Sequence, residues 1–193
     1  MEHYFTRKPT SSEEIHHIHT ILQGRKLIFE SSSGVFSKKR IDFGSRFLVE
    51  TVRLKNQDKL LDVGCGYGVC GIALSFHCRY AFLIDINLRA CYLTKTNIAL
   101  NGVTNASVIC GSPDCFRSFC DVAVMNPPIR AGKTLVFDLI LSTKRCLNPG
   151  GRLYLVARTK QGAKSIFVHM EEEFSSVTYA SLKGGYRVIE AAV

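Results

Sequence analysis

An acidic residue followed by three glycines at alternate positions gives the stretch Leu60–Gly68 the clearest chemical content in this sequence. The stretch begins with apolar residues, which predicts a buried strand that ends just beyond Asp62. Glycine tolerates positive φ angles and lets the backbone approach a ligand closely. The glycines are Gly64, Gly66 and Gly68, and the apolar residues after them predict a helix. A strand, a glycine-rich turn and a helix together begin a nucleotide-cofactor βαβ unit.

The tetrapeptide Asn126-Pro127-Pro128-Ile129 is a second candidate site, and it directly follows another predicted strand. Two consecutive prolines remove two backbone donors and fix the backbone, which predicts carbonyl groups that are free to face a ligand. The Asn126 side-chain oxygen and one proline carbonyl could together hold the two hydrogens of an exocyclic amino group. That grip would direct the nitrogen lone pair towards an electrophilic carbon, so catalysis would rest on orientation and electrostatics. The alternative is a turn that proline merely stiffens.

Both candidate sites lie at the ends of predicted strands that alternate with helices. Strands are expected over residues 59–63, 80–84, 106–110, 121–125, 152–157, 177–182 and 186–192. Asn87 can cap the helix after the second of these strands, and Asn101-Gly102 can end it. Apolar residues at i, i+3, i+4 and i+7 predict two further helices, over residues 136–147 and 163–174. This alternation predicts an α/β, doubly wound, mostly parallel sheet that binds ligands at the carboxyl ends of its strands.

The sequence predicts one domain over residues 1–193, because this length gives a good core but is short for two domains. Residues 1–25 are expected to form a loosely held leader with one helix over residues 15–22. A helix is also expected from Phe47 to about Leu54, and a short strand over residues 27–29.

Composition favours a soluble, cytoplasmic protein with a polyanionic partner. Hydrophobic residues make up 46% and charged residues 21% of the sequence, and the net charge is +9. A positive surface favours nucleic acid through counterion release, without sequence preference. No apolar run approaches the roughly 20 residues of a membrane span, and an apolar signal core is absent near Glu2 and His3.

The eight cysteines favour reduced, mostly buried thiols over a metal site. None of them forms a C-x-x-C pair, the commonest structural zinc signature. The histidines at positions 16, 17 and 19 have no partners at ligand spacing, so no metal is expected there either.

The order of acid and glycines resembles the first motif of class I S-adenosylmethionine (SAM) methyltransferases. A nicotinamide or flavin fingerprint would read G-x-G-x-x-G and would carry its acid after the second strand. That reading and a chance glycine turn are the alternatives. Asp85 follows at close to the roughly 20 residues expected for an acid on a ribose. Either Ser112 or Asp114 could accept the adenine amino group, while an ordinary loop acid is the alternative for Asp114.

Three stretches carry a more specific resemblance, to the small-domain methyltransferases that include the 16S rRNA guanine-N2 methyltransferases. They are residues 34–45, 61–68 and 126–133. The resemblance covers nearly the whole chain from about Ile28 and is strongest to single-domain bacterial members. It implies the seven-stranded Rossmann-like fold with an antiparallel C-terminal strand, SAM as cofactor, and an rRNA guanine amino group as acceptor in rRNA or the small ribosomal subunit. The cofactor residues it implies are Asp62, Gly64, Cys65, Gly66, Gly68, Asp85, Ile86, Ser112, Asp114 and Asn126.

Ile129 separates this sequence from neighbouring families, which usually continue Asn-Pro-Pro with Tyr or Phe and methylate adenine N6 or release-factor glutamine. Those activities, and a SAM-fold protein that binds RNA without catalysis, remain alternatives. Isoleucine has no π-face, so a flipped base must stack elsewhere. Candidate substrate residues are Phe36, Lys38, Lys39, Arg40, Arg130 and Lys133. A loop that buries Phe36 and plain surface charge are the alternatives for these residues.

Overall fold

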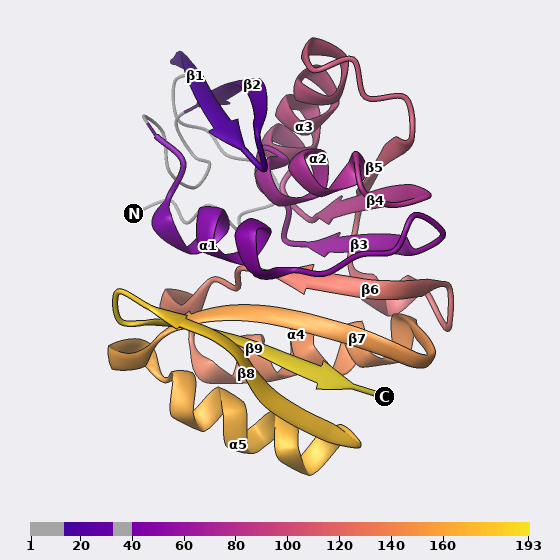
Figure 1. Ribbon diagram of the computed structural model, residues 1–193, viewed down its shortest axis with the longest axis vertical. Coiled ribbons are helices and arrows are strands. Elements are labelled where there is room, and N and C mark those ends of the chain that lie inside the picture. The colour runs from indigo at the N-terminus through magenta and orange to yellow at the C-terminus, as the bar shows by residue number, and fades with distance from the viewer. Residues whose placement is uncertain (1–13, 33–39) are drawn as a thin grey trace.

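The computed structural model describes residues 14–32 and 40–193 (Figure 1). Nine strands and five α-helices are present in this part of the chain. The strands are β1 (Ile15–Leu22), β2 (Arg25–Ser32), β3 (Lys59–Val63), β4 (Tyr80–Asp85), β5 (Ala106–Cys110), β6 (Cys120–Met125), β7 (Leu147–Arg158), β8 (Ser176–Lys183) and β9 (Tyr186–Ala192). The helices are α1 (Phe43–Thr51), α2 (Val69–Ser75), α3 (Leu88–Leu100), α4 (Lys133–Cys146) and α5 (Ala163–Glu173). Short 3-10 turns are η1 (Pro113–Cys115), η2 (Ile129–Ala131) and η3 (Thr159–Gln161).

Seven strands form the central sheet in the order β5-β4-β3-β6-β7-β9-β8. The pairs from β5 to β7 are parallel, whereas β9 runs antiparallel to both β7 and β8. This is the expected doubly wound, mostly parallel sheet with an antiparallel C-terminal strand. The strand order reverses between β3 and β6, and the crevice at such a switch point is where open α/β sheets bind ligands.

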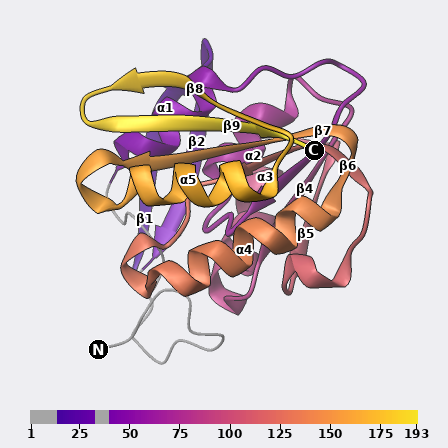
Figure 2. The ribbon, with the colours of Figure 1, turned by 90° about the horizontal axis from the view of Figure 1, so that it is seen from below.

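Helices cover both faces of the sheet because its strands carry apolar side chains on both sides. Leu60 and Leu61 show this alternation, since they are both buried but belong to clusters on opposite faces. One cluster includes residues of α1, α2 and α3, and the other includes residues of α4 and α5. Figure 2 shows α4 and α5 together on one side of the sheet.

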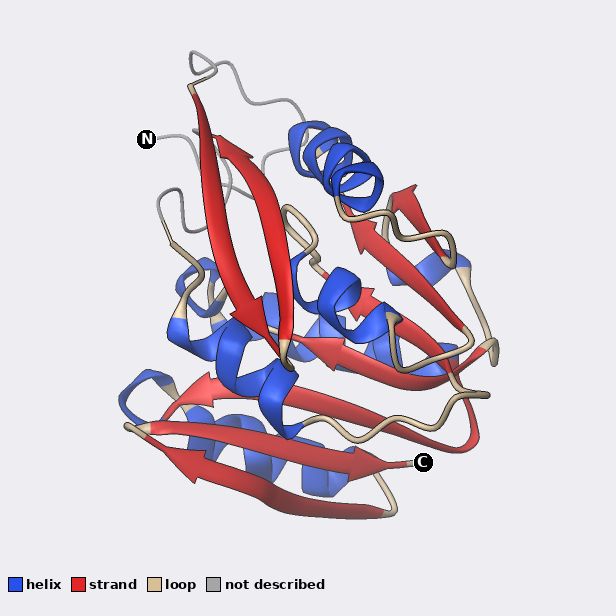
Figure 3. Cartoon of the chain, turned by 45° about the horizontal axis from the view of Figure 1, so that its top comes forward, coloured by secondary structure: helices blue, strands red, loops and turns tan. Residues whose placement is uncertain are grey.

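Residues 15–22 form a strand, so the helix expected there is wrong. β1 pairs antiparallel with β2, and the hairpin lies over the helices of one sheet face (Figure 3). Ile18 and Leu22 are four positions apart, a spacing that suits one face of a helix and also one face of a strand. Their side chains are buried in the core together with Phe29. The strand expected over residues 27–29 is confirmed within β2.

Asn97 in the last turn of α3 and Asn101, the residue after this helix, fasten the hairpin by hydrogen bonds to the backbone of β2. The Asn97 side chain accepts from Glu30 N and donates to Glu30 O, at 2.7 and 2.8 Å. Asn101 accepts from Ile28 N and donates to Ile28 O, at 3.0 and 2.7 Å. Asn97 also donates to Tyr67 O in the glycine-rich turn, at 2.8 Å. The hairpin and that turn are therefore joined through one buried side chain.

Candidate active site

A cavity of about 420 Å³ opens at the carboxyl ends of the parallel strands, between the first turn of α1 and the side of α4. Eleven predicted site residues line it: Asp62, Gly64, Cys65, Gly66, Asp85, Ile86, Ser112, Asp114, Asn126, Pro127 and Pro128. The lining also includes residues without a predicted role, among them Asp42, Ser45, Leu135, Asp138 and Ser142.

The remaining predicted residues lie elsewhere. Gly68, Ile129, Arg40 and Lys133 are described but are not part of the cavity lining. Ile129 is half-buried and packs against the core on the α4 and α5 side of the sheet. Phe36, Lys38, Lys39 and the Arg130 side chain lie outside the described residues.

The glycine-rich turn contains glycines with two different functions. Gly64 and Gly66 have φ angles of 68° and 59°, which L side chains rarely adopt. Gly68, the N-cap of α2, also has a positive φ of 94°, and in addition a Cβ there would lie 2.8 Å from Ile72 Cδ1. Its missing side chain thus serves the packing of α2.

Gly71 is a glycine that the sequence reading missed. A Cβ at this position would lie 2.5 Å from Leu83 Cδ2 and 3.0 Å from Asp62 Oδ2. The lack of a side chain at Gly71 lets α2 approach β4 closely, a function known for the third glycine of nucleotide-binding turns. The signal was available, since Gly66, Gly68 and Gly71 have the spacing G-x-G-x-x-G.

The Asp85 carboxylate ties the turn to the end of β4. Gly66 N donates to its Oδ2 and Asn87 N donates to its Oδ1, both at 2.9 Å. Burial raises the pKa of Asp85, and these two backbone hydrogen bonds oppose the rise. Each carboxylate oxygen has further lone pairs, so Asp85 can also accept from a ligand diol.

Asp62 is buried beneath the turn, and the residue is only 3% exposed. Gly71 N donates to its Oδ2 at 2.7 Å. Burial raises the pKa of Asp62 to about 7, against the effect of the Gly71 hydrogen bond, and the charge of Asp85 adds to the rise. The carboxyl group therefore changes charge near neutral pH.

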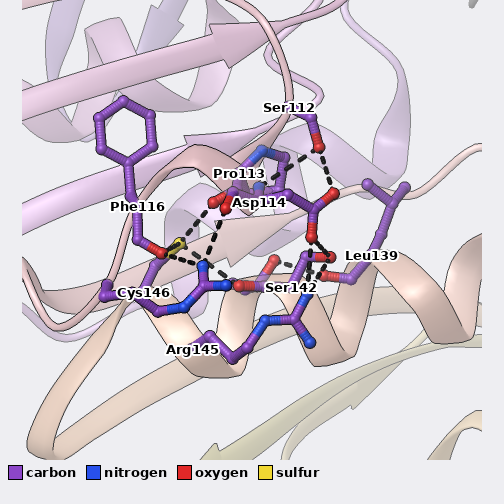
Figure 4. A network of polar contacts seen from close by, with 10 residues as sticks. Ser112, Pro113, Asp114, Phe116, Leu139, Ser142, Arg145 and Cys146 are labelled. Atoms are coloured by element: carbon purple, nitrogen blue, oxygen red, sulfur yellow. Dashed lines mark hydrogen bonds and ion pairs between the residues drawn. The ribbon is translucent and has the colours of Figure 1, made fainter.

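Asp114 joins η1 to α4 through a network of polar contacts (Figure 4). Its Oδ1 accepts from Ser142 Oγ at 2.5 Å and from Arg145 at 2.6 Å, and Ser112 Oγ donates to its Oδ2 at 2.7 Å. The Ser142 hydrogen bond is the largest cause of the lowered pKa of Asp114. Asp114 therefore has structural partners for both oxygens, while Ser112 and Asp114 stay alternative adenine contacts.

Asn126 stands at the end of β6, beside the end of β3. Its Nδ2 donates to Ser45 Oγ at 3.0 Å and to Asp42 Oδ1 at 3.4 Å. Both amide hydrogens thus have acceptors on the first turn of α1. Among the described residues, Oδ1 has no hydrogen-bond donor, and it is the atom left for a ligand.

The proline carbonyls are less free than the sequence suggested. Ile129 N donates to Pro127 O and Ala131 N donates to Pro128 O, both at 2.8 Å. The prolines start the tight turn η2, and that turn uses their carbonyls. A carbonyl oxygen has a second lone pair, so either can still accept one more hydrogen bond.

The electrostatics of the lining favour a cationic ligand. Five aspartates line the cavity, at positions 42, 62, 85, 114 and 138, and no Lys or Arg is among the described residues of the lining. The pyrophosphate of a nicotinamide or flavin dinucleotide would meet these carboxylates without a neutralising cation. SAM carries a sulfonium, an ammonium and a carboxylate group, so its net positive charge suits this lining, and the apolar Ile86, Leu135 and Leu139 suit its adenine.

All eight cysteines are free, and six of them are buried. No group of three or more potential ligands that could hold a metal ion occurs among the described residues. No described helix is long and apolar enough to cross a membrane.

The fold and the cavity together define a Rossmann-like, SAM-dependent methyltransferase. A family model for the methyltransferase small domain matches residues 26–190. The chain therefore belongs to the methyltransferase small domain family.

Individual relatives differ in how much of their length the chain spans. YbxB of Bacillus subtilis (strain 168), described as uncharacterized, is 37% identical over an alignment of 197 positions that covers 98% of this chain and 98% of that protein. Ribosomal RNA small subunit methyltransferase C of Salmonella arizonae is 34% identical over 137 residues, covering 68% of this chain and 40% of that protein. The T. thermophilus 16S rRNA N2 G1207 methyltransferase (RsmC), solved with AdoMet and guanosine, superposes with a TM-score of 0.84. The identity to it is 20%, over 95% of this chain and 52% of that one. The chain thus spans only about half of these rRNA methyltransferases.

Proposed function

We propose that this chain transfers a methyl group from SAM to the exocyclic N2 amino group of a guanine in small-subunit rRNA. The observation that carries the proposal is an amide acceptor, Asn126 Oδ1, at the edge of a cavity lined by carboxylates. Such a site accepts hydrogens and suits a cationic donor. The named rRNA methyltransferases among the relatives support RNA as the substrate class.

The residues would act by binding and orientation. SAM supplies an electrophilic methyl group when bound. Asp85 would accept from the ribose hydroxyls, and the turn at Gly64 and Gly66 would admit the methionine part. Asn126 Oδ1, with the second lone pair of a proline carbonyl, would hold the two amino hydrogens and aim the nitrogen lone pair at the methyl group. Such preorganised polar groups contribute mainly through orientation and electrostatics.

In this proposal the acidic cavity receives the base of the substrate, and the basic outer surface of the protein contacts its phosphates. A guanine base is neutral and can enter, whereas its phosphates must remain outside. A guanine in a duplex hides its amino group in the minor groove, so the base must flip or be single-stranded.

An aromatic and basic surface beside Asn126 fits such an RNA. Phe43 is 40% exposed, and its ring lies 5.0 Å from that of Tyr186. The Arg158 guanidinium lies 4.9 Å from the Tyr186 ring centroid. The Tyr186 ring reaches the site, since its Cε1 is 3.2 Å from the position of a Cβ on Gly44. Two exposed lysines lie in neighbouring turns, Lys160 in η3 and Lys183 at the turn between β8 and β9. The hydrogen bond from Thr159 N to Gly185 O joins these turns.

Tritium-labelled SAM offered with naked 16S rRNA, isolated small subunits or release factor tests the proposal. We expect label in RNA, and digestion with mass spectrometry should identify N2-methylguanosine. Asn126→Ala is the control, and its rate should fall about 10²-fold because one preorganised group is lost. Label found only as N6-methyladenosine or methylglutamine would overturn the acceptor assignment and leave the fold and the cofactor in place.

A further inference from the structure

We infer that Asp42 and Ser45 are positioning residues that hold the Asn126 amide with its oxygen towards the substrate. The inference rests on the proposed function, because it concerns how the amino group is gripped. It assigns a role to the start of α1, which is 81 and 84 positions away from Asn126 in sequence.

An asparagine amide can sit in its site in two ways, related by half a turn that exchanges O and NH2. Only one of them presents an acceptor to an amino group, since the other would bring donors against donors. Ser45 Oγ and Asp42 Oδ1 both accept from Nδ2, at 3.0 and 3.4 Å. A flipped amide would place its oxygen against the Asp42 carboxylate, so these two contacts select the competent orientation.

The two positioning side chains are themselves fixed by the helix start. Asp42 is the N-cap of α1, and its Oδ1 accepts from Ser45 N at 3.2 Å. Gly44 between them leaves room for the Asp42 carboxylate, because a Cβ there would lie only 2.9 Å from Asp42 Oδ1. Asp42, Gly44 and Ser45 thus form one rigid support for a side chain on β6.

Two variants remove the support while keeping the helix cap. Ser45→Ala deletes the hydroxyl but leaves its backbone N–H on Asp42. Asp42→Ser keeps a good N-cap residue, but its side chain is too short to reach Asn126. We expect each to lower the single-turnover methyl-transfer rate about tenfold, the effect of one lost hydrogen bond. For Ser45→Ala, which leaves the charge of the cavity lining unchanged, SAM affinity measured by calorimetry should stay within about twofold of wild type.

A double-mutant cycle with Asn126→Ala separates positioning from a general structural effect. If Ser45 acts through Asn126, Ser45→Ala should add no further loss once Asn126 is alanine. The same tenfold loss in both backgrounds would overturn the inference.

The side-chain NH2 resonances of Asn126 give a readout that needs no RNA substrate. Asn126→Ala identifies them by their disappearance from a nitrogen-proton spectrum. Ser45→Ala and Asp42→Ser should each shift them, and unchanged resonances in both would refute the contacts. If wild type fails to methylate guanine while the resonances shift as expected, the proposed function fails and the amide support stands.

Discussion

Asp62 gives the protein a pH dependence that can be traced to one carboxyl group. Its folded pKa of about 7 lies above the ordinary value of 3.8, mainly because of burial. Between these values the folded protein holds a proton that the unfolded chain releases. The contribution of Asp62 to the free energy of unfolding is therefore complete below about pH 4 and is lost as the pH rises through 7.

Asp62→Asn should remove this dependence while keeping an acceptor for Gly71 N. We expect the variant to be more stable than wild type by about 1–3 kcal/mol at pH 8, since each pKa unit is worth about 1.4 kcal/mol. The difference should shrink towards pH 5. Urea unfolding of both proteins from pH 5 to 8 measures it, and parallel pH curves would contradict the assignment.

Asp85 provides the residue-scale test of the cofactor site. Asp85→Ala should weaken SAM binding by about 1–3 kcal/mol, because ribose hydroxyls would lose their acceptor. It also frees two backbone donors, Gly66 N and Asn87 N, so the control is Asp85→Asn, whose single side-chain oxygen can still accept from one of them. Calorimetry on folded variants should rank SAM affinity as wild type, then Asn, then Ala. Equal affinities would remove Asp85 from the cofactor site.

At the scale of elements, the β1–β2 hairpin is held against α3 by Asn97 and Asn101, whose side chains hydrogen-bond to the backbone of β2. Asn97 is fully buried, and three of its hydrogen bonds lead to Glu30 and Tyr67. Asn97→Ala would remove all three of these hydrogen bonds at once. We expect this loss to cost about 2–4 kcal/mol, because each intramolecular hydrogen bond contributes about 1 kcal/mol and these three lie away from solvent.

Asn101→Ala is the matched control, because the same kind of contact lies nearer to solvent and water can replace it. It should cost about 1 kcal/mol or less. Urea unfolding gives both values, and hydrogen exchange at Ile28 and Glu30 should show which end of the hairpin opens. Equal costs would show that burial does not control these contacts.

The strands of the central sheet were predictable because glycine, proline and asparagine mark their ends. Lys59–Val63, Ala106–Cys110 and Tyr186–Ala192 have the predicted bounds. Asp62, Asp85 and Asn126 could be placed together because parallel strands bring their carboxyl ends to one edge. The hairpin was missed because its two inward residues also fit a helix. No local pattern could show that Ser45 contacts Asn126, since only the packing of α1 against the sheet, chiefly on β7 next to β6, brings them together.

The whole molecule separates charge of opposite sign. The net charge is +9, yet the cavity is lined by aspartates. RNA binding should therefore depend on salt, because phosphates meet the outside of the protein.

Arg158→Gln should weaken RNA binding and reduce the slope of log K against log salt by about one. Phe43→Ala should weaken binding by about 1–3 kcal/mol, the value of base stacking on one aromatic ring, with the salt slope unchanged. Filter binding at several salt concentrations separates the two effects, and the control is Arg79→Gln, at an exposed position just before β4 and so at the opposite edge of the sheet. If both variants bind RNA with the affinity of wild type, the RNA-binding surface lies elsewhere on the protein. SAM affinity should be unchanged in all three.

The position of β9 in the sheet has a consequence for the order in which the parts of the site are synthesised on the ribosome. Every described residue of the cavity lining falls between Asp42 and Ser142, whereas Arg158 and Tyr186 are translated later. Chains emerge at about 5–20 residues per second, so Tyr186 leaves the ribosome a few seconds after the last cavity residue. Because β9 runs antiparallel to β7, its first residue, Tyr186, pairs with Arg158 at the carboxyl end of β7. This is the edge of the sheet at which the cavity opens. The order of translation thus places the walls of the donor cavity first and the aromatic surface beside Asn126 last.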